Sequence, residues 1–254
     1  MAGATAVVEI HPWNSLSECL VSARELPFEL PLSSTLSKSW MLPFEDYSPV
    51  RRLRSYKGQR NFTGSWWCAT TGRHVGFESW LERDHLMFRD FDPAVTGISS
   101  QPFRLDFELA GSRRCHVPDY FLRLTDGDAV VIDVRPEARI KTRDREIFEA
   151  TRQACETVGW SYELVGELSG ARVANVRWLS GFRHERCLDP GIIAPLLEAV
   201  SSSGRPTIES VARSVGDPIA VLPSVYYLLW NHRLSADLGA APLSPRTPIT
   251  AGAP

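Results

Sequence analysis

The segment HVPDYFLRLTDGDAVVIDVRP, at 116–136, places the strongest constraint on what this chain can fold into. Two apolar runs, CHVPDYFLRL at 115–124 and AVVIDVRP at 129–136, flank the sequence TDGD, which is typical of a tight turn in a β-hairpin. The second run is rich in Val and Ile, as in a central strand that is buried on both faces. The segment therefore predicts a hairpin within a sheet, with an acidic residue at each of its ends, Asp119 and Asp133.

The segments around this hairpin predict helices and further strands. Residues 74–91 carry apolar side chains at helical spacing, which indicates a helix. Residues 98–109 are typical of a first strand, residues 139–158 of an amphipathic helix, and residues 161–166 of a last strand. The order helix, three strands, helix, strand is a meander followed by a crossover helix, so we expect an α/β fold with a mixed sheet.

The C-terminal part has a different pattern. Residues 190–200 predict a short helix, and a Ser- and Gly-containing linker follows. Residues 206–215 and 219–234 predict two further helices, joined by the turn GDP, with the second helix broken near Pro223 and short strands after it. Two helices with a tight turn, followed by strands, are typical of a winged helix. The alternative is a helical addition that binds a protein partner and makes no contact with DNA.

Composition narrows the class of protein. The 254 residues carry a net charge of -2, so any nucleic-acid site must be a local patch. The five cysteines are scattered, with no CxxC pair, which favours reduced thiols in a cytoplasmic protein over a disulfide scaffold or a zinc site. We find no apolar stretch long enough for a transmembrane helix and no signal peptide, and therefore expect no membrane partner.

Two basic segments are candidates for contact with DNA. Five of the ten residues at 51–60 are basic, and the pair Trp66 and Trp67 follows, a mixture that suits phosphate and base contacts. The candidates in this segment are Arg51, Arg52, Arg54, Lys57 and Arg60. Arg139, Lys141 and their basic neighbours form the second segment, with acids between them. The alternative in both places is a solvated surface, with the tryptophans in the core.

The acidic residues suggest a metal site. Asp133 and Arg135 lie two apart on a strand and point the same way, Asp119 lies on the neighbouring strand, and the helix at 74–91 brings Glu78 and Glu82 on one face. Adjacent buried carboxylates need a compensating charge, and all-oxygen ligands suit Mg²⁺ or Mn²⁺. Such a site next to an arginine suits phosphodiester hydrolysis. The alternative is that Asp133 and Arg135 form a structural ion pair and that Pro118-Asp119 belongs to a simple turn.

The segment FESWLERDHLMFRDFDPAVTGISSQPF, followed by PDYFLRL and IDVRP, resembles the TnsA family, the PD-(D/E)xK endonuclease subunits of heteromeric transposases. The resemblance runs from about Arg51 to the C-terminus. It implies that Glu82 is the catalytic glutamate, with Glu78 as the alternative, and that Asp119 and Asp133 complete the metal ligands. Arg135 falls where the family has lysine.

The resemblance also implies a function and a domain order. We expect a restriction-endonuclease-like mixed sheet flanked by helices at 45–186, a small winged-helix-like domain at 187–254, and an N-terminal arm at 1–44. The implied activity is Mg²⁺- or Mn²⁺-dependent cleavage of double-stranded DNA at transposon ends, on the 5′ strands. The implied partners are a recombinase-type transposase subunit, which handles the 3′ ends, and an ATPase regulator, which contacts the C-terminal domain.

Two other functions remain open. Arginine cannot act as a base at neutral pH, so a catalytically inactive DNA-binding or assembly subunit on the same fold is one alternative. A stand-alone nuclease of repair or restriction type is another. His116 precedes the Pro118-Asp119 pair, and we favour a hydrogen-bonded strand histidine over a ligand for metal or phosphate.

Overall fold

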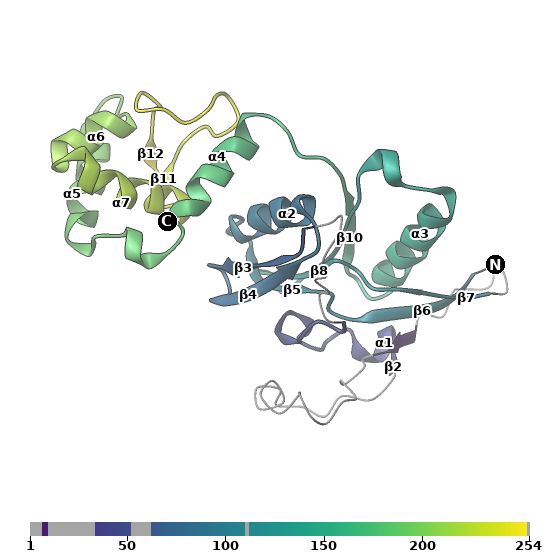
Figure 1. The fold of residues 1–254 in the computed structure, drawn as a ribbon. Coiled ribbons are helices and arrows are strands. Elements are labelled where there is room, and N and C mark those ends of the chain that lie inside the picture. The colour runs from purple at the N-terminus through teal and green to yellow at the C-terminus, as the bar shows by residue number, and fades with distance from the viewer. Residues whose placement is uncertain (1–6, 10–33, 52–61, 110–111, 253–254) are drawn as a thin grey trace. The chain divides into compact units, whose positions relative to one another are not determined.

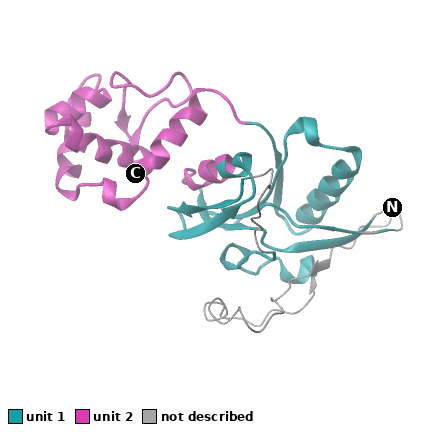
Figure 2. Cartoon of the chain, viewed as in Figure 1, with its two compact units in different colours: residues 1–83, 94–167 teal, residues 84–93, 168–254 magenta. Residues whose placement is uncertain are grey.

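The computed structural model describes residues 7–9, 34–51, 62–109 and 112–252. The chain divides into two compact units, shown in Figure 2. The first unit comprises residues 1–83 and 94–167, and the second comprises residues 84–93 and 168–254. The boundary at 167 differs from the expected domain boundary at 186. Within the residues that the structure describes, no helix is long and apolar enough to span a membrane.

A mixed four-stranded sheet forms the centre of the first unit, in the order β10-β9-β8-β5. Its strands are β5 (Val95–Ser100), β8 (Tyr120–Leu124), β9 (Ala129–Val134) and β10 (Ser161–Val165). β5, β8 and β9 are antiparallel neighbours, and β10 runs parallel to β9. The crossover between β9 and β10 contains α3 (Thr142–Glu156), which packs against β10 (Figure 1). The predicted hairpin and mixed sheet are confirmed, and all six residues of β9 are buried.

A second sheet extends the first unit, in the order β2-β1-β6-β7. Its strands are β1 (Val7–Glu9), β2 (Ser34–Thr35), β6 (Arg104–Leu109) and β7 (Ser112–His116). The predictions of single strands at 98–109 and 115–124 were wrong, because each segment divides between the two sheets. The division falls at Pro102 in one and Pro118 in the other. Proline has no N–H to donate to a sheet, and Gln101 before Pro102 has a φ of 49°.

The start of the helix predicted at 74–91 was also wrong. Residues 73–77 form β4 (Arg73–Phe77), which pairs with β3 (Gly64–Cys68), and α2 covers only Trp80–Asp90. Val75 and Phe77 are buried two residues apart, the period of a strand. Glu78 therefore precedes the helix and does not share a helix face with Glu82.

The core of the first unit includes residues from the expected N-terminal arm. The described part of the arm contains α1 (Leu36–Ser39) and leads into the 3-10 turn η1 (Phe44–Asp46). Phe44 is fully buried and makes edge-to-face contacts with Phe103, Phe121 and Trp160. Residues 1–6 and 10–33 of the arm lie outside the described residues, but residues 34–44 are part of the folded unit.

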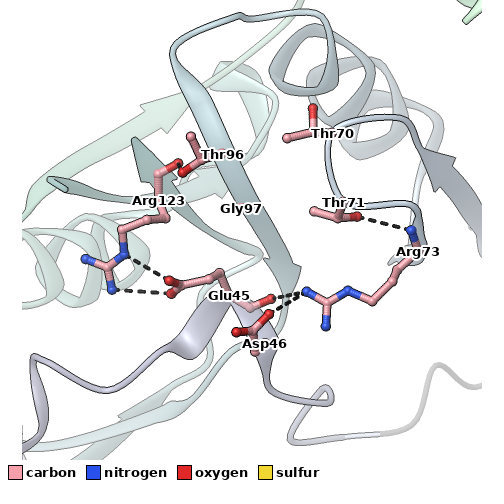
Figure 3. Close-up of a pocket in the computed structure, with 8 residues that line it drawn as sticks. All are labelled: Glu45, Asp46, Thr70, Thr71, Arg73, Thr96, Gly97 and Arg123. Atoms are coloured by element: carbon pink, nitrogen blue, oxygen red, sulfur yellow. Dashed lines mark hydrogen bonds and ion pairs between the residues drawn. The ribbon is translucent and has the colours of Figure 1, made fainter. Parts of the chain in front are cut away.

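Ion pairs link η1 to β8 of the central sheet and to β4. Figure 3 shows Glu45 pairing with Arg123 of β8 and Asp46 pairing with Arg73 of β4, around an open polar pocket of about 430 Å³. Gly97 of β5 lies under Glu45, and a Cβ atom at Gly97 would come within 2.8 Å of the Glu45 side chain. The close approach of η1 to β5 thus depends on a glycine at this position.

The second unit consists of helices and one small sheet. Its elements include α4 (Ala171–Leu179), α5 (Ile193–Ser202), α6 (Ile208–Val215), α7 (Pro218–Trp230), β11 (Leu234–Ser235) and β12 (Thr250–Ala251). The predicted break near Pro223 was wrong, since α7 is continuous through it. The i−4 carbonyl belongs to Ile219, which is 84% exposed, so water can satisfy it. The order α6, turn, α7, β11 and β12 is the one expected for a winged helix, which stays a prediction.

Candidate active site

The β8–β9 hairpin brings Asp119 next to Asp133. Tyr120 pairs with Ile132 in the antiparallel register, so Asp119, one residue before β8, lies across from Asp133. The backbone N–H of Asp119 donates to the Ile132 carbonyl at 3.1 Å, and that of Val134 donates to Oδ2 of Asp119 at 2.8 Å. The Asp119 side chain therefore closes the end of the hairpin and is fixed by the backbone of β9.

Two further side chains fix Asp133, which is 2% exposed. Nε2 of His116 lies 2.7 Å from Oδ2 of Asp133, and the Tyr162 hydroxyl donates to the same oxygen at 2.7 Å. The favoured interpretation of His116, a hydrogen-bonded strand histidine, agrees with this contact. The sequence analysis missed Tyr162, because its contact with Asp133 depends on the parallel register of β10 against β9, which no local pattern in the sequence gives.

Burial and the neighbouring acidic side chains change the pKa of Asp119. Burial raises the pKa of Asp119 well above its usual range, and the carboxyl groups of Asp133 and Glu82 raise it further. The Val134 N–H and the Arg135 guanidinium act in the opposite direction and lower this pKa. All four predicted site residues, Glu82, Asp119, Asp133 and Arg135, are thus close enough to influence a single carboxyl group.

The Glu82 carboxyl group also accepts hydrogen bonds at the start of α2. Its Oε1 accepts a hydrogen bond from the Ser79 hydroxyl at 2.9 Å, and its Oε2 accepts one from the Glu78 N–H at 2.6 Å. Ser79 Oγ in turn accepts the N–H of Glu82 at 3.2 Å, as in a helix capping box. Burial raises the pKa of Glu82. The carboxyl group therefore lies near Asp119 while it also caps the helix.

Glu78, the alternative acid, forms an ion pair with Arg51. Its Oε2 pairs with Arg51 at 2.7 Å, whereas the Glu82 carboxyl group is one of those that raise the pKa of Asp119. Glu82 is therefore the better candidate for the site. Arg51, a predicted DNA contact, is engaged in this pair. The other candidates from that segment, Arg52, Arg54, Lys57 and Arg60, lie outside the described residues.

The basic side chains after β9 are exposed. The backbone N–H of Arg135 donates to the Val165 carbonyl of β10 at 2.8 Å, and its side chain is exposed. Arg139 lies in a 3-10 turn, and Lys141 immediately precedes α3, which begins at Thr142 and not at 139 as predicted. Both side chains are exposed, and neither makes an ion pair with another residue that the structure describes. They can therefore contact a phosphate group.

The donor set fits a hard divalent cation in its chemistry, although the residues are not assembled around one. Over the described ranges, no group of three or more His, Cys, Asp and Glu residues is arranged to hold a metal ion. However, Oδ1 of Asp119 and Oδ1 of Asp133 accept no hydrogen bond from the described residues, and carboxylate oxygens are the ligands that Mg²⁺ and Mn²⁺ prefer. Mutual repulsion among the acids is what a bound cation relieves.

The comparison with known families covers the hairpin and the crossover. Residues 92–167 match the family model described as TnsA-like endonuclease N terminal. The matched range contains Asp119, Asp133 and Arg135 and starts after Glu82. A search of curated proteins finds no match to the chain. The family match points to a nuclease that acts in transposition. It confirms the resemblance, over residues 92–167, to the TnsA-like endonucleases.

Proposed function

We propose that this chain is a Mg²⁺- or Mn²⁺-dependent DNA endonuclease subunit of a transposition complex, which cleaves the 5′ strands at transposon ends. The observation that carries the proposal is the coupling at Asp119. The carboxyl groups of Asp133 and Glu82 and the guanidinium of Arg135 all shift its pKa. Three of these four residues lie in the segment that matches the TnsA-like endonucleases.

Each residue has a separate role in the proposed reaction. Oδ1 of Asp119 and Oδ1 of Asp133 would hold the cation, with Glu82 as a third ligand. When bound, the cation supplies Lewis-acid stabilisation of the phosphate and lowers the pKa of the attacking water. Arg135 binds the scissile phosphate and offsets the negative charge that develops on it. His116 and Tyr162 hold Oδ2 of Asp133, so Oδ1 would remain available to the cation.

The exposed cations after β9 support contact with the DNA backbone. Arg139 and Lys141 follow Arg135 closely in the chain, so a strand whose phosphate binds Arg135 can continue along them. These contacts carry no sequence information by themselves. With a net charge of -2 for the whole chain, we propose that specificity for transposon ends comes from partners, a recombinase-type transposase subunit and an ATPase regulator. The winged-helix-like domain would bind the regulator.

A second candidate function rests on two observations. Arg135 stands in place of the family lysine, and both oxygens of Glu82 accept hydrogen bonds that cap α2. A chain in which these features abolish cleavage would be an assembly subunit that binds DNA without cutting it. Its acidic residues would then be dispensable for DNA binding.

Nicking of a supercoiled plasmid in Mn²⁺ separates the two functions. We expect the native chain to nick and Asp119→Asn to lose at least about 100-fold in rate, because one ligand and one charge are lost. Arg135→Lys should retain activity, whereas Arg135→Ala should lose roughly 100-fold. Asp128→Asn, an exposed acid in the same hairpin, is the matched control. An Asp119→Asn protein as active as the native chain would refute the proposal. An inactive native chain that gains activity as Arg135→Lys would support the assembly subunit.

A further inference from the structure

The side chain of Tyr120 connects the β8–β9 hairpin with β4, within the first unit. Tyr120 is the first residue of β8 and directly follows Asp119. It is 1% exposed, and its hydroxyl donates a hydrogen bond to the Gly76 carbonyl of β4 at 3.3 Å. One buried side chain therefore joins the strand that follows Asp119 to the strand that leads into α2.

The period of β8 explains why Tyr120 points toward β4. Adjacent residues of a strand point to opposite faces of the sheet. Phe121 makes edge-to-face contacts with Phe44 and Trp160 in the aromatic core. Tyr120 therefore projects from the other face, where its hydroxyl contacts β4.

The contact matters because no β-ladder joins β4 to the central sheet within the described residues. β4 pairs with β3 in a separate two-stranded sheet and packs against β5. Strand register therefore does not fix β4, or the helix that follows it, relative to the hairpin. A hydroxyl that is buried without its acceptor is costly, so the hydrogen bond between Tyr120 and Gly76 holds β8 and β4 together.

The backbone just after Gly76 holds the Glu82 side chain. The N–H of Glu78, two residues after Gly76, donates to Oε2 of Glu82 at 2.6 Å. The Ser79 hydroxyl donates to Oε1 of Glu82 at 2.9 Å. The position of β4 at Gly76 thus determines where the Glu82 carboxyl group lies.

Both Glu82 and Asp119 act electrostatically on the Tyr120 hydroxyl. Burial raises the pKa of Tyr120 well above its usual range, and the carboxyl groups of Glu82 and Asp119 raise it further. The hydroxyl therefore stays protonated and remains a hydrogen-bond donor. Two of the proposed metal ligands, one from α2 and one from the hairpin, are close enough to influence this single hydroxyl.

We propose that Tyr120 is a positioning residue that holds the Glu82 carboxyl group beside Asp119, so that both can bind one cation. The inference rests on the proposed function, because it concerns the same metal ligands. Tyr120 is buried and contacts neither the DNA nor the cation. It acts through the Gly76 carbonyl and the turn that holds Glu82. Removing a group that orients a metal ligand typically costs about 10–100-fold in metal affinity.

The test is a double-mutant cycle on Mn²⁺ affinity, measured by isothermal calorimetry on the full chain with a short DNA duplex present. Tyr120→Phe removes the hydroxyl and keeps the ring. Glu82→Gln removes the charge of the ligand through which Tyr120 acts. Tyr47→Phe is the matched control, because Tyr47 is also buried in the first unit and its hydroxyl has no hydrogen-bond partner among the described residues.

We expect Tyr120→Phe to weaken Mn²⁺ binding about tenfold and Tyr47→Phe to leave it unchanged. In the Glu82→Gln background, Tyr120→Phe should have little further effect, because the side chain that it positions no longer carries a ligand charge. Affinity for DNA in EDTA should be the same in Tyr120→Phe and in the native chain. A general loss of stability would produce neither the dependence on Glu82 nor the unchanged affinity for DNA.

Hydrogen exchange in EDTA tests the positioning without a metal. The Glu78 N–H, which donates to Glu82, should exchange several-fold faster in Tyr120→Phe than in the native chain or Tyr47→Phe. Exchange at Glu78 that Tyr120→Phe does not change would overturn the positioning role.

The calorimetry can overturn the positioning role as well. Mn²⁺ affinity that is unchanged in Tyr120→Phe would do so, and so would a loss that is equal in the native and Glu82→Gln backgrounds. Either result with Asp119-dependent Mn²⁺ binding intact would leave the nuclease standing. A native chain that binds no Mn²⁺ would instead refute the nuclease, and hydrogen exchange at Glu78 would then decide the role of Tyr120.

Discussion

At the scale of single residues, Asp119 links stability to pH. Its pKa is raised, first by burial and then by the carboxyl groups of Asp133 and Glu82. The ionised form is therefore less favourable in the folded chain than in the unfolded one. The stability that this group contributes is complete below its unfolded pKa of about 3.9, and it is lost as pH rises through the higher folded pKa.

We therefore expect Asp119→Asn to melt at a higher temperature than the native chain near pH ~7 in the absence of metal. Its amide oxygen can still accept the Val134 N–H, so the hairpin end is preserved. The difference should shrink as pH falls below the unfolded pKa of about 3.9, where the Asp119 carboxyl is protonated in both the folded and the unfolded state. Differential scanning calorimetry in EDTA across this range measures it. A lower melting temperature for Asp119→Asn at neutral pH would contradict a raised pKa for Asp119 in the folded chain.

Tyr162 gives a second prediction at this scale. Its hydroxyl donates to Oδ2 of Asp133, which is 2% exposed. Tyr162→Phe removes the donor and leaves a buried acceptor with His116 as its remaining partner, so we expect a loss of roughly 1–3 kcal/mol in the free energy of unfolding. Denaturant titration measures the loss. A variant as stable as the native chain would mean that the hydroxyl does not hold Asp133.

The residues of the site were predictable to different degrees. Asp119, Asp133 and Arg135 could be inferred together because one hairpin and one strand period fix their relation. Tyr162 could not, because its contact crosses 29 residues and depends on the parallel register of β10 against β9. The choice of Glu82 over Glu78 depended on where a helix starts, and periodicity locates helix ends poorly.

At the scale of elements, Ser79 sets the start of α2. Its hydroxyl accepts the N–H of Glu82 and donates to the Glu82 carboxyl group. Ser79→Ala should cost about 1 kcal/mol of stability, measured by denaturant unfolding. Ser203→Ala, at an exposed helix end without a side-chain hydrogen bond among the described residues, should change nothing. Equal effects of the two substitutions would contradict the capping role.

Gly97 determines how closely η1 approaches β5. A Cβ there would lie 2.8 Å from Cβ and Cγ of Glu45, so Gly97→Ala must displace the side chain that pairs with Arg123. We expect a loss of about 1–3 kcal/mol and a lower melting temperature. Gly181→Ala, where an added Cβ meets nothing within 4 Å, is the control and should be close to neutral. A stable Gly97→Ala protein would show that η1 is not tightly held.

The strands show why element types were easier to predict than their limits. The apolar content of residues 98–109 and 115–124 continues across Pro102 and Pro118, so propensity alone joins what the fold divides. The two prolines were the available signal. The opposite error occurred at Pro223, where packing of the buried residues Val221, Val225 and Leu228 maintains a helix in spite of the missing N–H.

At the scale of the whole molecule, the family match and the first compact unit end at the same residue. The match ends at residue 167, and the first compact unit ends at Glu167. The sequence did not predict that residues 84–93 belong to the second unit. Their membership rests on contacts across long stretches of chain, such as Arg177 with Asp84 at 2.8 Å and His232 with the Phe91 carbonyl at 2.6 Å. No local pattern encodes such contacts.

The most direct test of the proposed metal-dependent nuclease is a Mn²⁺ titration by isothermal calorimetry, with a short DNA duplex present. It requires no knowledge of the cognate DNA ends or of partner subunits. Native chain and Asp128→Asn should bind Mn²⁺ alike, and Asp119→Asn should lose the binding, because Oδ1 of Asp119 is a proposed ligand. Binding that persists unchanged in Asp119→Asn, or is absent from the native chain, would contradict a metal site at the β8–β9 hairpin.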